Sequence, residues 1–269
     1  MQPIEQLNLI DQAHCPLGNN PPDAPVRAGS GMDARPPSCF GIGMRFVRPI
    51  RVRSLATCTQ PENPMNKPRL TYFDFAGSRG EECRIALHLA GLDFEDVRIK
   101  GAEWPALKAS MPFGAMPVLE VPGQAPLAHS NAILVFIGRQ HGLHPVDAFE
   151  AARHESMMCA VEELRHTITP TLRISDPEQK RAAREALAAN ELATWGGQVE
   201  GQLGEGPFVG GRSLQVSDIK LYMVVRWLTS GTLDHVPATV LDHCPKLLRL
   251  YRAVGEHPGV KAWLAKPAS

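Results

Sequence analysis

The chain has 269 residues, 43% hydrophobic and 21% charged, which is enough apolar material for the core of one large or two ordinary domains. Lysine plus arginine and aspartate plus glutamate number 28 each, so no overall charge favours nucleic acid or an anionic membrane as a partner. No apolar run approaches the ~20 residues of a transmembrane helix, and the start lacks the basic-then-apolar order of a secretory signal, which predicts a cytoplasmic protein.

The six cysteines are scattered, with no CxxC pair and no spacing typical of a metal site. This argues against a disulfide scaffold and against a dithiol oxidoreductase. We expect the cysteines to be reduced and to serve mostly in packing.

Residues 1–64 differ in composition from the rest of the chain. They hold ten of the 24 prolines and six arginines but no lysine, and they show neither strand alternation nor a helical stripe. This predicts a disordered leader, or a translation start assigned too early, because Met65 begins "MNKPRLTYFDF" as a compact domain would. The locally basic stretch 44–58 leaves an organelle-targeting segment as an alternative.

The next part of the chain, 65–142, alternates between strand and helix patterns. Gly91 is the predicted stop of its first helix and Ser130 the predicted N-cap of its last. The order βαβαββα predicts a small mixed sheet covered by helices. Strands are predicted at 69–75, 93–99, 116–121 and 125–129, and helices at 81–91, 103–111 and 130–142.

Helical patterns alone follow from about residue 150 to the end. Asp176 and Pro177 predict the N-cap and first residue of one helix. The segment 218–228 is apolar almost all round, as in a helix at the centre of a bundle. An earlier helix has an apolar stripe at i, i+4, i+7 and i+11, formed by Met157, Val161, Leu164 and Ile168.

Four segments in this order and spacing, "LTYF", "EWPALK", "PFGAMPVLEV" and "AHSNAI", resemble those of a cytosolic glutathione transferase of the sigma type, the prostaglandin D synthase-like group, in a bacterial-looking form. The likeness covers about residues 66–266. It implies an α/β plus all-α protein: an N-terminal thioredoxin-like βαβαββα domain at 65–142 that binds glutathione, followed by an all-helical C-terminal domain at 150–269. It also implies a homodimer.

The resemblance assigns the chemistry to Tyr72 and Arg79. A free thiol has a pKa near 8.5, so the enzyme has to stabilise the glutathione thiolate. Tyr72 sits where sigma-type enzymes place the tyrosine that donates its hydroxyl proton to the sulfur, and Arg79 matches the arginine that supports it. The loop "DFAGS" is one residue longer than the family's spacing, which leaves a solvated turn arginine as the alternative for Arg79.

Three segments would hold the tripeptide. The backbone of Met116, before the family's cis-proline at Pro117, would pair with the cysteinyl unit. Ser130, at a helix N-terminus, would bind the γ-glutamyl carboxylate. His129 stands beside it where the family commonly has glutamine, so this end of the site departs from the pattern.

The resemblance implies that the segment "EWPALK" binds the glycyl end of glutathione. Trp104 and Lys108 resemble the pair that contacts it, the tryptophan by its ring N–H and the lysine by its charge. Surface packing and a solvated lysine are the alternatives for these two residues.

In the family's first long helix, some members collect a divalent metal on carboxylates. This chain has Glu162, Arg165 and His166 in that region, which predicts no metal site. An acceptor pocket for an apolar electrophile would lie beside the tyrosine, although methionines at helical spacing also fit a packed core. Its candidate lining is Phe73, Phe75, Met157 and Met158.

Three functions remain open from the sequence. The first, which we take as the hypothesis, is conjugation of glutathione to small apolar electrophiles. The second is isomerisation or peroxide reduction on the same fold with glutathione as cofactor. The third is a non-catalytic binding or structural protein, against which stand the retained Tyr72 and Ser130.

Overall fold

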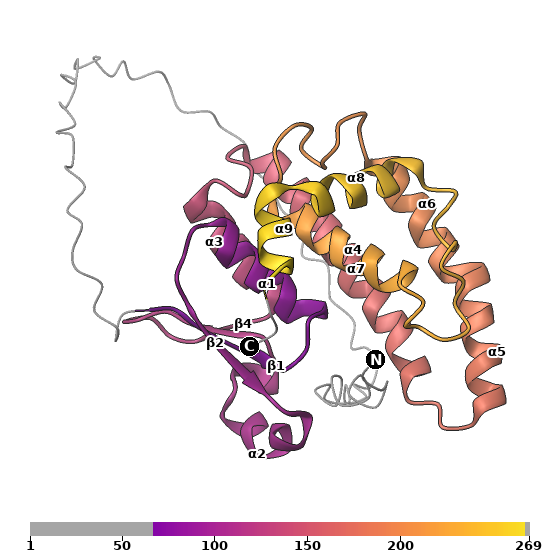
Figure 1. Cartoon of the computed structure of the whole chain (residues 1–269), viewed down its shortest axis with the longest axis horizontal. Helices are drawn as coiled ribbons and strands as arrows, with labels where there is room; N and C mark the ends of the chain where they lie inside the picture. Colours follow the sequence, from indigo (N-terminus) through magenta and orange to yellow (C-terminus); the bar gives the residue numbers. More distant parts are fainter. Residues whose placement is uncertain (1–66, 267–269) are drawn as a thin grey trace, which may run out of the picture. The chain divides into compact units, whose positions relative to one another are not determined.

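A four-stranded sheet forms the first half of the computed structural model, which describes residues 67–266 (Figure 1). Its strand order is β2-β1-β3-β4, with β1 parallel to β2 and antiparallel to β3, and β3 antiparallel to β4. The parallel pair needs a crossover, which α1 (Ser78–Leu89) supplies. The predicted mixed sheet is confirmed, with β1 (Arg69–Phe73), β2 (Glu95–Ile99), β3 (Val118–Glu120) and β4 (Leu127–Ala128).

Helices cover both faces of this sheet. α1 and α3 (Ser130–His141) lie on one side, and the short α2 (Trp104–Leu107), with 3-10 turns around it, lies on the other (Figure 1). Two apolar clusters result. The main core takes in α1, α3 and the helical half, whereas a smaller cluster is made of Tyr72, Phe73, Ile99 and Trp104.

The helix ends agree with the sequence prediction only in part. α1 begins at Ser78, three residues before its predicted start, and of the predicted helix 103–111 only Trp104–Leu107 is α-helical. Gly91 follows α1 with a φ of 69°, in the left-handed region that glycine enters at little cost, as predicted. Ser130 is not the N-cap of α3 but its first helical residue, and the cap position belongs to His129 with a φ of 71°. The reason is that β4 ends at Ala128, so a single residue has to make the whole turn into the helix.

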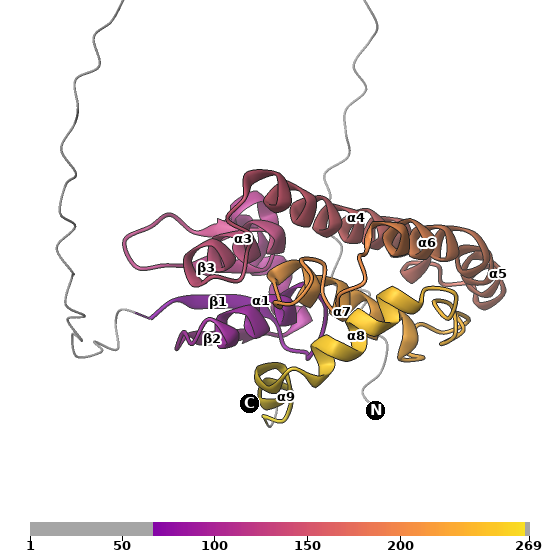
Figure 2. The same cartoon turned by 90° about the horizontal axis from the view of Figure 1, so that it is seen from above.

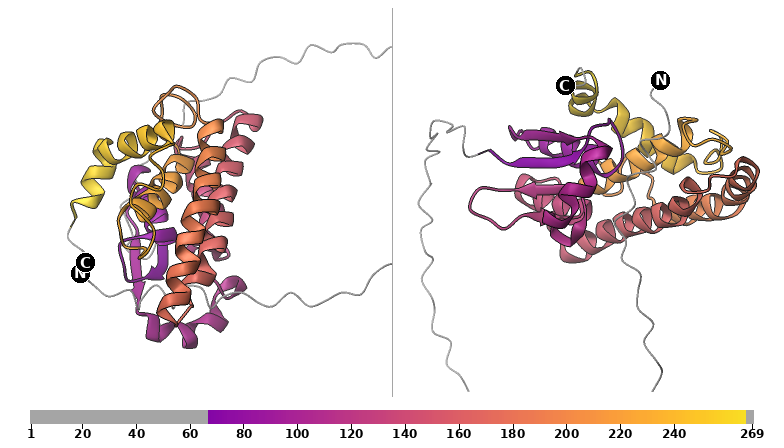
Figure 3. Two further views of the ribbon diagram at one scale, coloured as in Figure 1. Left: turned by 90° about the vertical axis from the view of Figure 1, so that its right-hand side faces the viewer. Right: turned by 90° about the horizontal axis from the view of Figure 1, so that it is seen from below.

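The second half is helical, as predicted, and described residues of both halves belong to one compact unit. Asp176 caps α5 by accepting a hydrogen bond from the Gln179 N–H at 2.8 Å, with Pro177 at the first position. A π turn at Ala188–Leu192 joins α5 to α6, and the pair runs beside α4 (Figures 2 and 3). The helices are α4 (Ala148–Leu172), α5 (Pro177–Leu187), α6 (Ala193–Gln202), α7 (Val216–Thr229), α8 (Pro245–Glu256) and α9 (Pro258–Leu264).

The centre of this half is α7, which contacts α1, α4 and α8. It is buried along most of its length, as its apolar sequence predicted. The predicted α4 stripe is also confirmed, because Met157, Val161, Leu164 and Ile168 all lie in the main core. α7 therefore joins the sheet half to the helical half.

Several expectations fall on residues outside the described ones. The leader 1–64, with its three cysteines, and Met65 lie there, as do residues 267–269. Within the described part, Cys83, Cys159 and Cys244 are free. No helix between residues 67 and 266 is both long enough and apolar enough to span a bilayer.

A buried histidine links α4 to α7. His154 is fully buried, and its Nδ1 lies 2.8 Å from Ser217 Oγ. Burial lowers the pKa of His154 to about 4, with further lowering by His144 and Arg153 and an opposing effect of Glu150. The imidazole is therefore neutral in the folded chain at neutral pH.

Because His154 is buried in its neutral form, we expect the protein to lose stability in acid. Folding lowers the pKa of His154. Its contribution to the free energy of unfolding is therefore complete at pH values above the ordinary pKa of 6.5, and it is lost as the pH falls toward about 4. Between about pH 7.5 and about pH 5 we expect the wild-type free energy of unfolding to fall by about 2 kcal/mol more than that of His154→Asn. Urea unfolding of both proteins at the two pH values measures this, and equal losses would contradict it.

Candidate functional site

Tyr72 occupies the centre of the small apolar cluster. Its side chain on β1 is 1% exposed, and its ring centroid lies 5.5 Å from that of Phe73 and 5.8 Å from that of Phe75. Its buried hydroxyl has no hydrogen-bond partner among the described residues. Since buried hydroxyls are nearly always paired, this one is suited to bond an atom of a ligand.

The charge state of Tyr72 makes it a donor. Burial raises the pKa of its hydroxyl above the ordinary value, while Arg79, Ser78 and Arg165 lower it and Glu82 raises it further. The Ser78 side chain is near enough to affect this pKa but makes no hydrogen bond of ordinary geometry with the hydroxyl. The hydroxyl keeps its proton, which it can donate to an anionic partner.

A second unpartnered donor lies in the same cluster. Trp104 is 2% exposed, its ring centroid is 5.9 Å from that of Phe73, and its Nε1 has no partner among the described residues. Lys108 follows one turn later and is partly buried. Met116 packs against the cluster, and the Met116–Pro117 bond is cis, as the motif predicted.

Behind Tyr72 lies a set of charged residues, three buried and two partly buried, that joins the two halves of the fold. Arg79 Nε donates to Glu162 Oε2 at 2.8 Å, and Arg165 bonds Glu162 Oε1 at 2.9 Å and also Glu82. Lys220 Nζ lies 3.1 Å from Glu82 Oε2 and 2.5 Å from Glu162 Oε1. We call these five residues of α1, α4 and α7 the buried charged cluster.

Glu162 and Arg165 are held in their charged forms by the other members of this cluster. Burial alone would raise the pKa of Glu162, but Lys220, Arg165 and Arg79 outweigh it and hold that pKa well below its usual range. Burial likewise opposes the charge of Arg165, yet Glu82 and Glu162 raise its pKa overall. Three cations thus face two carboxylates, which leaves one positive charge in excess among these described residues.

Ser130 is bound to this cluster. Its side chain is 3% exposed, and its Oγ lies 3.1 Å from Lys220 Nζ. His129, by contrast, is exposed and stacks on Phe113, with ring centroids 5.3 Å apart. Phe113 is itself 80% exposed, an unusual position for so large an apolar side chain.

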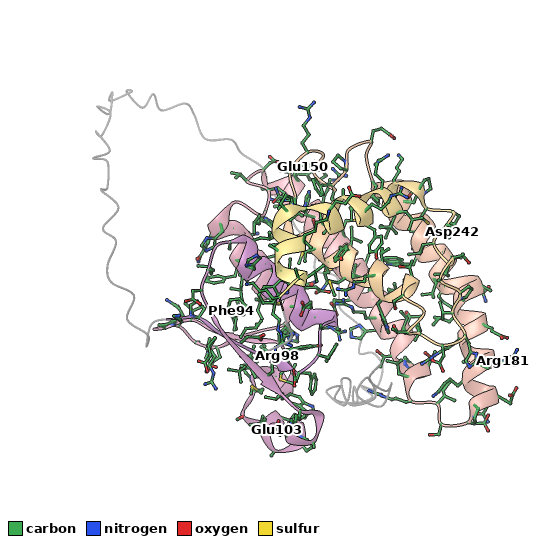
Figure 4. The ribbon with its side chains drawn as sticks, viewed as in Figure 1. Phe94, Arg98, Glu103, Glu150, Arg181 and Asp242 are labelled. Atoms are coloured by element: carbon green, nitrogen blue, oxygen red, sulfur yellow. The ribbon has the colours of Figure 1, made fainter. Side chains whose placement is uncertain are left out.

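The expected acceptor residues separate into two groups. Phe73 and Phe75 pack against Tyr72, whereas Met157 and Met158 lie in the main core and not in the tyrosine's cluster. The structure also has an open hollow at the other end of β1, which contains none of the predicted site residues. It is lined by Lys67, Arg69, Glu95, Glu120 and Phe94, the last labelled in Figure 4.

The sequence analysis missed the roles of Glu82 and Lys220. It considered Arg165 only as a residue in a region where some family members have metal-binding carboxylates. A signal was present, because a lysine inside an otherwise apolar helix and a second glutamate at the start of α1 need buried partners. Nothing in the sequence paired them, since Glu82 and Lys220 are 138 positions apart. In residues 67–266 no three side chains from His, Cys, Asp and Glu are grouped as a metal would need.

The site requires a residue without a side chain at position 80, next to the ring of Tyr72. A Cβ added there would lie 2.1 Å from a ring carbon of Tyr72, which is closer than any real contact, and the buried ring has little room to move. Gly80→Ala should lower the free energy of unfolding by about 1–3 kcal/mol. Thermal unfolding measures this.

A matched control is Gly197→Ala, since a Cβ added at that helical position would meet no described atom within 4 Å apart from its own helix backbone and chain neighbours. We expect that change to leave stability unchanged or raise it slightly. Equal stability of the two variants would contradict the close approach of Gly80 to Tyr72.

Two family models match the chain. "Glutathione S-transferase, N-terminal domain" matches residues 68–139, and "Glutathione S-transferase, C-terminal domain" matches residues 162–267. The two matches correspond to the sheet half and to most of the helical half.

Individual proteins give the same result. Hematopoietic prostaglandin D synthase of Gallus gallus is 30% identical over 199 residues, 74% of this chain and 95% of that protein. Glutathione S-transferase 1 of Ascaris suum is 42% identical over 110 residues, so the chain spans about half (52%) of that relative. A solved glutathione S-transferase of Necator americanus, described as monomeric, is 30% identical with a TM-score of 0.62, covering 75% of this chain and 98% of that one. All three are animal proteins and lend no support to a bacterial-looking form.

Proposed function

Because the chain belongs to the glutathione S-transferase family, we propose that it activates the glutathione thiol at Tyr72 and conjugates it to small apolar electrophiles. One observation carries this proposal: Tyr72 has a buried, protonated hydroxyl without a partner among the described residues, beside a cluster with excess positive charge. A thiolate sulfur accepts a hydrogen bond from such a hydroxyl, and nearby guanidinium groups favour its negative charge.

The rest of the tripeptide is proposed to bind along the elements around Tyr72. Trp104, whose Nε1 has no partner within residues 67–266, would hold the glycyl end together with Lys108. The backbone of Met116, before Pro117, would pair with the cysteinyl unit. Ser130 would take the γ-glutamyl carboxylate at the first turn of α3, with His129 at its edge.

The reaction then follows from thiolate chemistry. The thiol proton leaves to solvent, and the sulfur electron pair forms a bond to an electrophilic carbon of the acceptor. The displaced electron pair departs with the leaving group. Phe73 and Phe75 supply apolar surface next to the sulfur, whereas Met157 and Met158 are committed to the core. The proposal needs no metal ion.

A second candidate is an isomerase that uses glutathione as cofactor. The name of the Gallus gallus relative, a prostaglandin D synthase, favours it, and so does the resemblance of the sequence motifs to those of the sigma type. Both activities need the same thiolate, so only the products separate them: a glutathione conjugate in one case, and a rearranged substrate with free glutathione in the other.

Substitution of the tyrosine tests the proposed activation. Tyr72→Phe removes one hydrogen bond to the sulfur but no packing, so we expect glutathione binding to stay nearly constant while turnover falls about ten-fold or more. The bound thiol should have a pKa below its free value of about 8.5 in the wild type and a higher one in the variant. Thiolate absorbance against pH and turnover with a chlorodinitrobenzene measure the two effects.

The chain offers a matched control for this experiment. Tyr251 lies on α8, where its ring stacks on that of Tyr222 with centroids 5.2 Å apart, outside the small apolar cluster. Tyr251→Phe should leave both turnover and thiol pKa unchanged. Unchanged turnover in Tyr72→Phe would refute the role of Tyr72, and a wild-type chain without glutathione affinity would favour a non-catalytic protein.

We also propose that the chain forms a homodimer through the surface around Phe113. The Phe113 side chain is 80% exposed and stacks on His129 next to the proposed γ-glutamyl site. The backbone of Phe113 has a φ of 56°. A partner subunit would bury it. The monomeric description of the Necator americanus relative shows why the state of this chain has to be measured.

Phe113→Ser tests this surface. Removing the exposed aromatic ring should weaken the dimer about ten-fold or more, as truncation of a central interface residue does. Light scattering after size exclusion over a range of concentrations measures this. Phe149→Ser, at a second exposed aromatic residue 73% accessible on α4, is the control for a general loss of surface hydrophobicity. A wild-type monomer would contradict the proposal.

A further inference from the structure

Lys220 is a fully buried cation in the first half of α7, a helix whose other buried residues are mostly apolar. Its Nζ contacts Glu82 Oε2, Glu162 Oε1 and Ser130 Oγ at 3.1, 2.5 and 3.1 Å. An ammonium has three N–H donors, so these three acceptors satisfy all of them. Burying a lysine without such partners would be costly, and its position is therefore well defined.

The contact with Ser130 has a fixed direction. An ammonium can only donate, so the Ser130 oxygen accepts, and its own hydrogen points elsewhere. The structure gives that hydrogen no acceptor among the described residues, although Ser130 is only 3% exposed. A hydroxyl that accepts from a cation also becomes a stronger donor, because linked hydrogen bonds polarise one another.

The surrounding charge selects the ligand group. The buried charged cluster has one positive charge in excess. The nearby carboxylates Glu81 and Asp96 do not balance it, because they are paired with two cations of their own, Arg84 and Arg98. Ser130 also begins α3, where the helix dipole favours negative charge. The ligand group that fits is a carboxylate which accepts from Ser130.

We propose that Lys220 is a positioning residue for the γ-glutamyl α-carboxylate of glutathione: it fixes Ser130 as a hydrogen-bond donor toward that group. This inference rests on the proposed function. It gives the helical half of the fold a part in ligand recognition, since Ser130 belongs to the sheet half and Lys220 to α7.

Calorimetry on the full chain tests the assignment with two probes, glutathione and an analogue in which γ-aminobutyrate replaces the γ-glutamyl residue and so removes only the α-carboxylate. Lys220→Met should weaken glutathione binding about ten-fold or more and change the affinity for the analogue little. In turnover assays, KM for glutathione should rise by a larger factor than kcat falls, because Tyr72 remains in place although the cluster loses its excess positive charge.

A double variant separates hydrogen bonding from charge. Glu82→Gln combined with Lys220→Met restores the excess positive charge of the cluster but not the bond to Ser130. Glutathione binding should stay weak in it, and a recovery to wild-type affinity would overturn the positioning role. The double variant also removes the buried carboxylate that Lys220→Met deprives of a partner, so it serves as the test should the single variant fail to fold.

The remaining outcomes separate this inference from the proposed function. Wild-type binding of glutathione with unchanged affinity in both variants would overturn the assignment of Lys220 alone. Equal weakening of glutathione and of its analogue would also overturn it, because a general structural effect does not distinguish the carboxylate. A wild-type chain that fails to bind glutathione would overturn the proposed function and the assignment together.

Discussion

The ion pairs between α1, α4 and α7 are the constraint on which the rest of the site depends. Glu82 binds both Arg165 and Lys220, and Glu162 binds Arg79, Arg165 and Lys220, so each carboxylate is shared between cations from different helices. A buried ion pair adds little stability compared with apolar packing, but loss of one partner leaves an unpaired buried charge. The cluster therefore fixes how the two halves pack more than it strengthens that packing.

Apolar packing holds the donors of the site on the other side of Tyr72. The rings of Phe73 and Phe75 and the backbone of Gly80 pack against the tyrosine ring and hold it in place, and its buried hydroxyl has no partner among the described residues. Trp104 is held in the same way through its contact with Phe73. Fixed donors of this kind favour a charge that develops at one place, since little reorganisation is needed when it appears.

The sequence predicted the order of the elements, the α4 stripe and the buried α7 because local periodicity and turn residues determine these features. It placed the N-cap of α3 one residue late, since the short β4 and the left-handed His129 are not visible in a pattern of residue types. The buried charged cluster could not be predicted from the sequence for another reason. Its members come from three helices, and the pairing of Glu82 with Lys220 is decided only when those helices pack.

The cluster also explains how a domain contact can affect ligand affinity. Arg79 and Arg165 act on Tyr72 at the sulfur end of the proposed site, and Lys220 acts on Ser130 at its γ-glutamyl end. The shared carboxylates Glu82 and Glu162 connect these cations, so a shift of α7 against α1 would change both ends together. Binding of an anionic ligand would in turn compensate the excess positive charge and stabilise the contact between the halves, because a ligand that binds only the folded arrangement favours it. On the proposed function, affinity at the site and packing of α7 on α1 would thus be two effects of the same electrostatic balance.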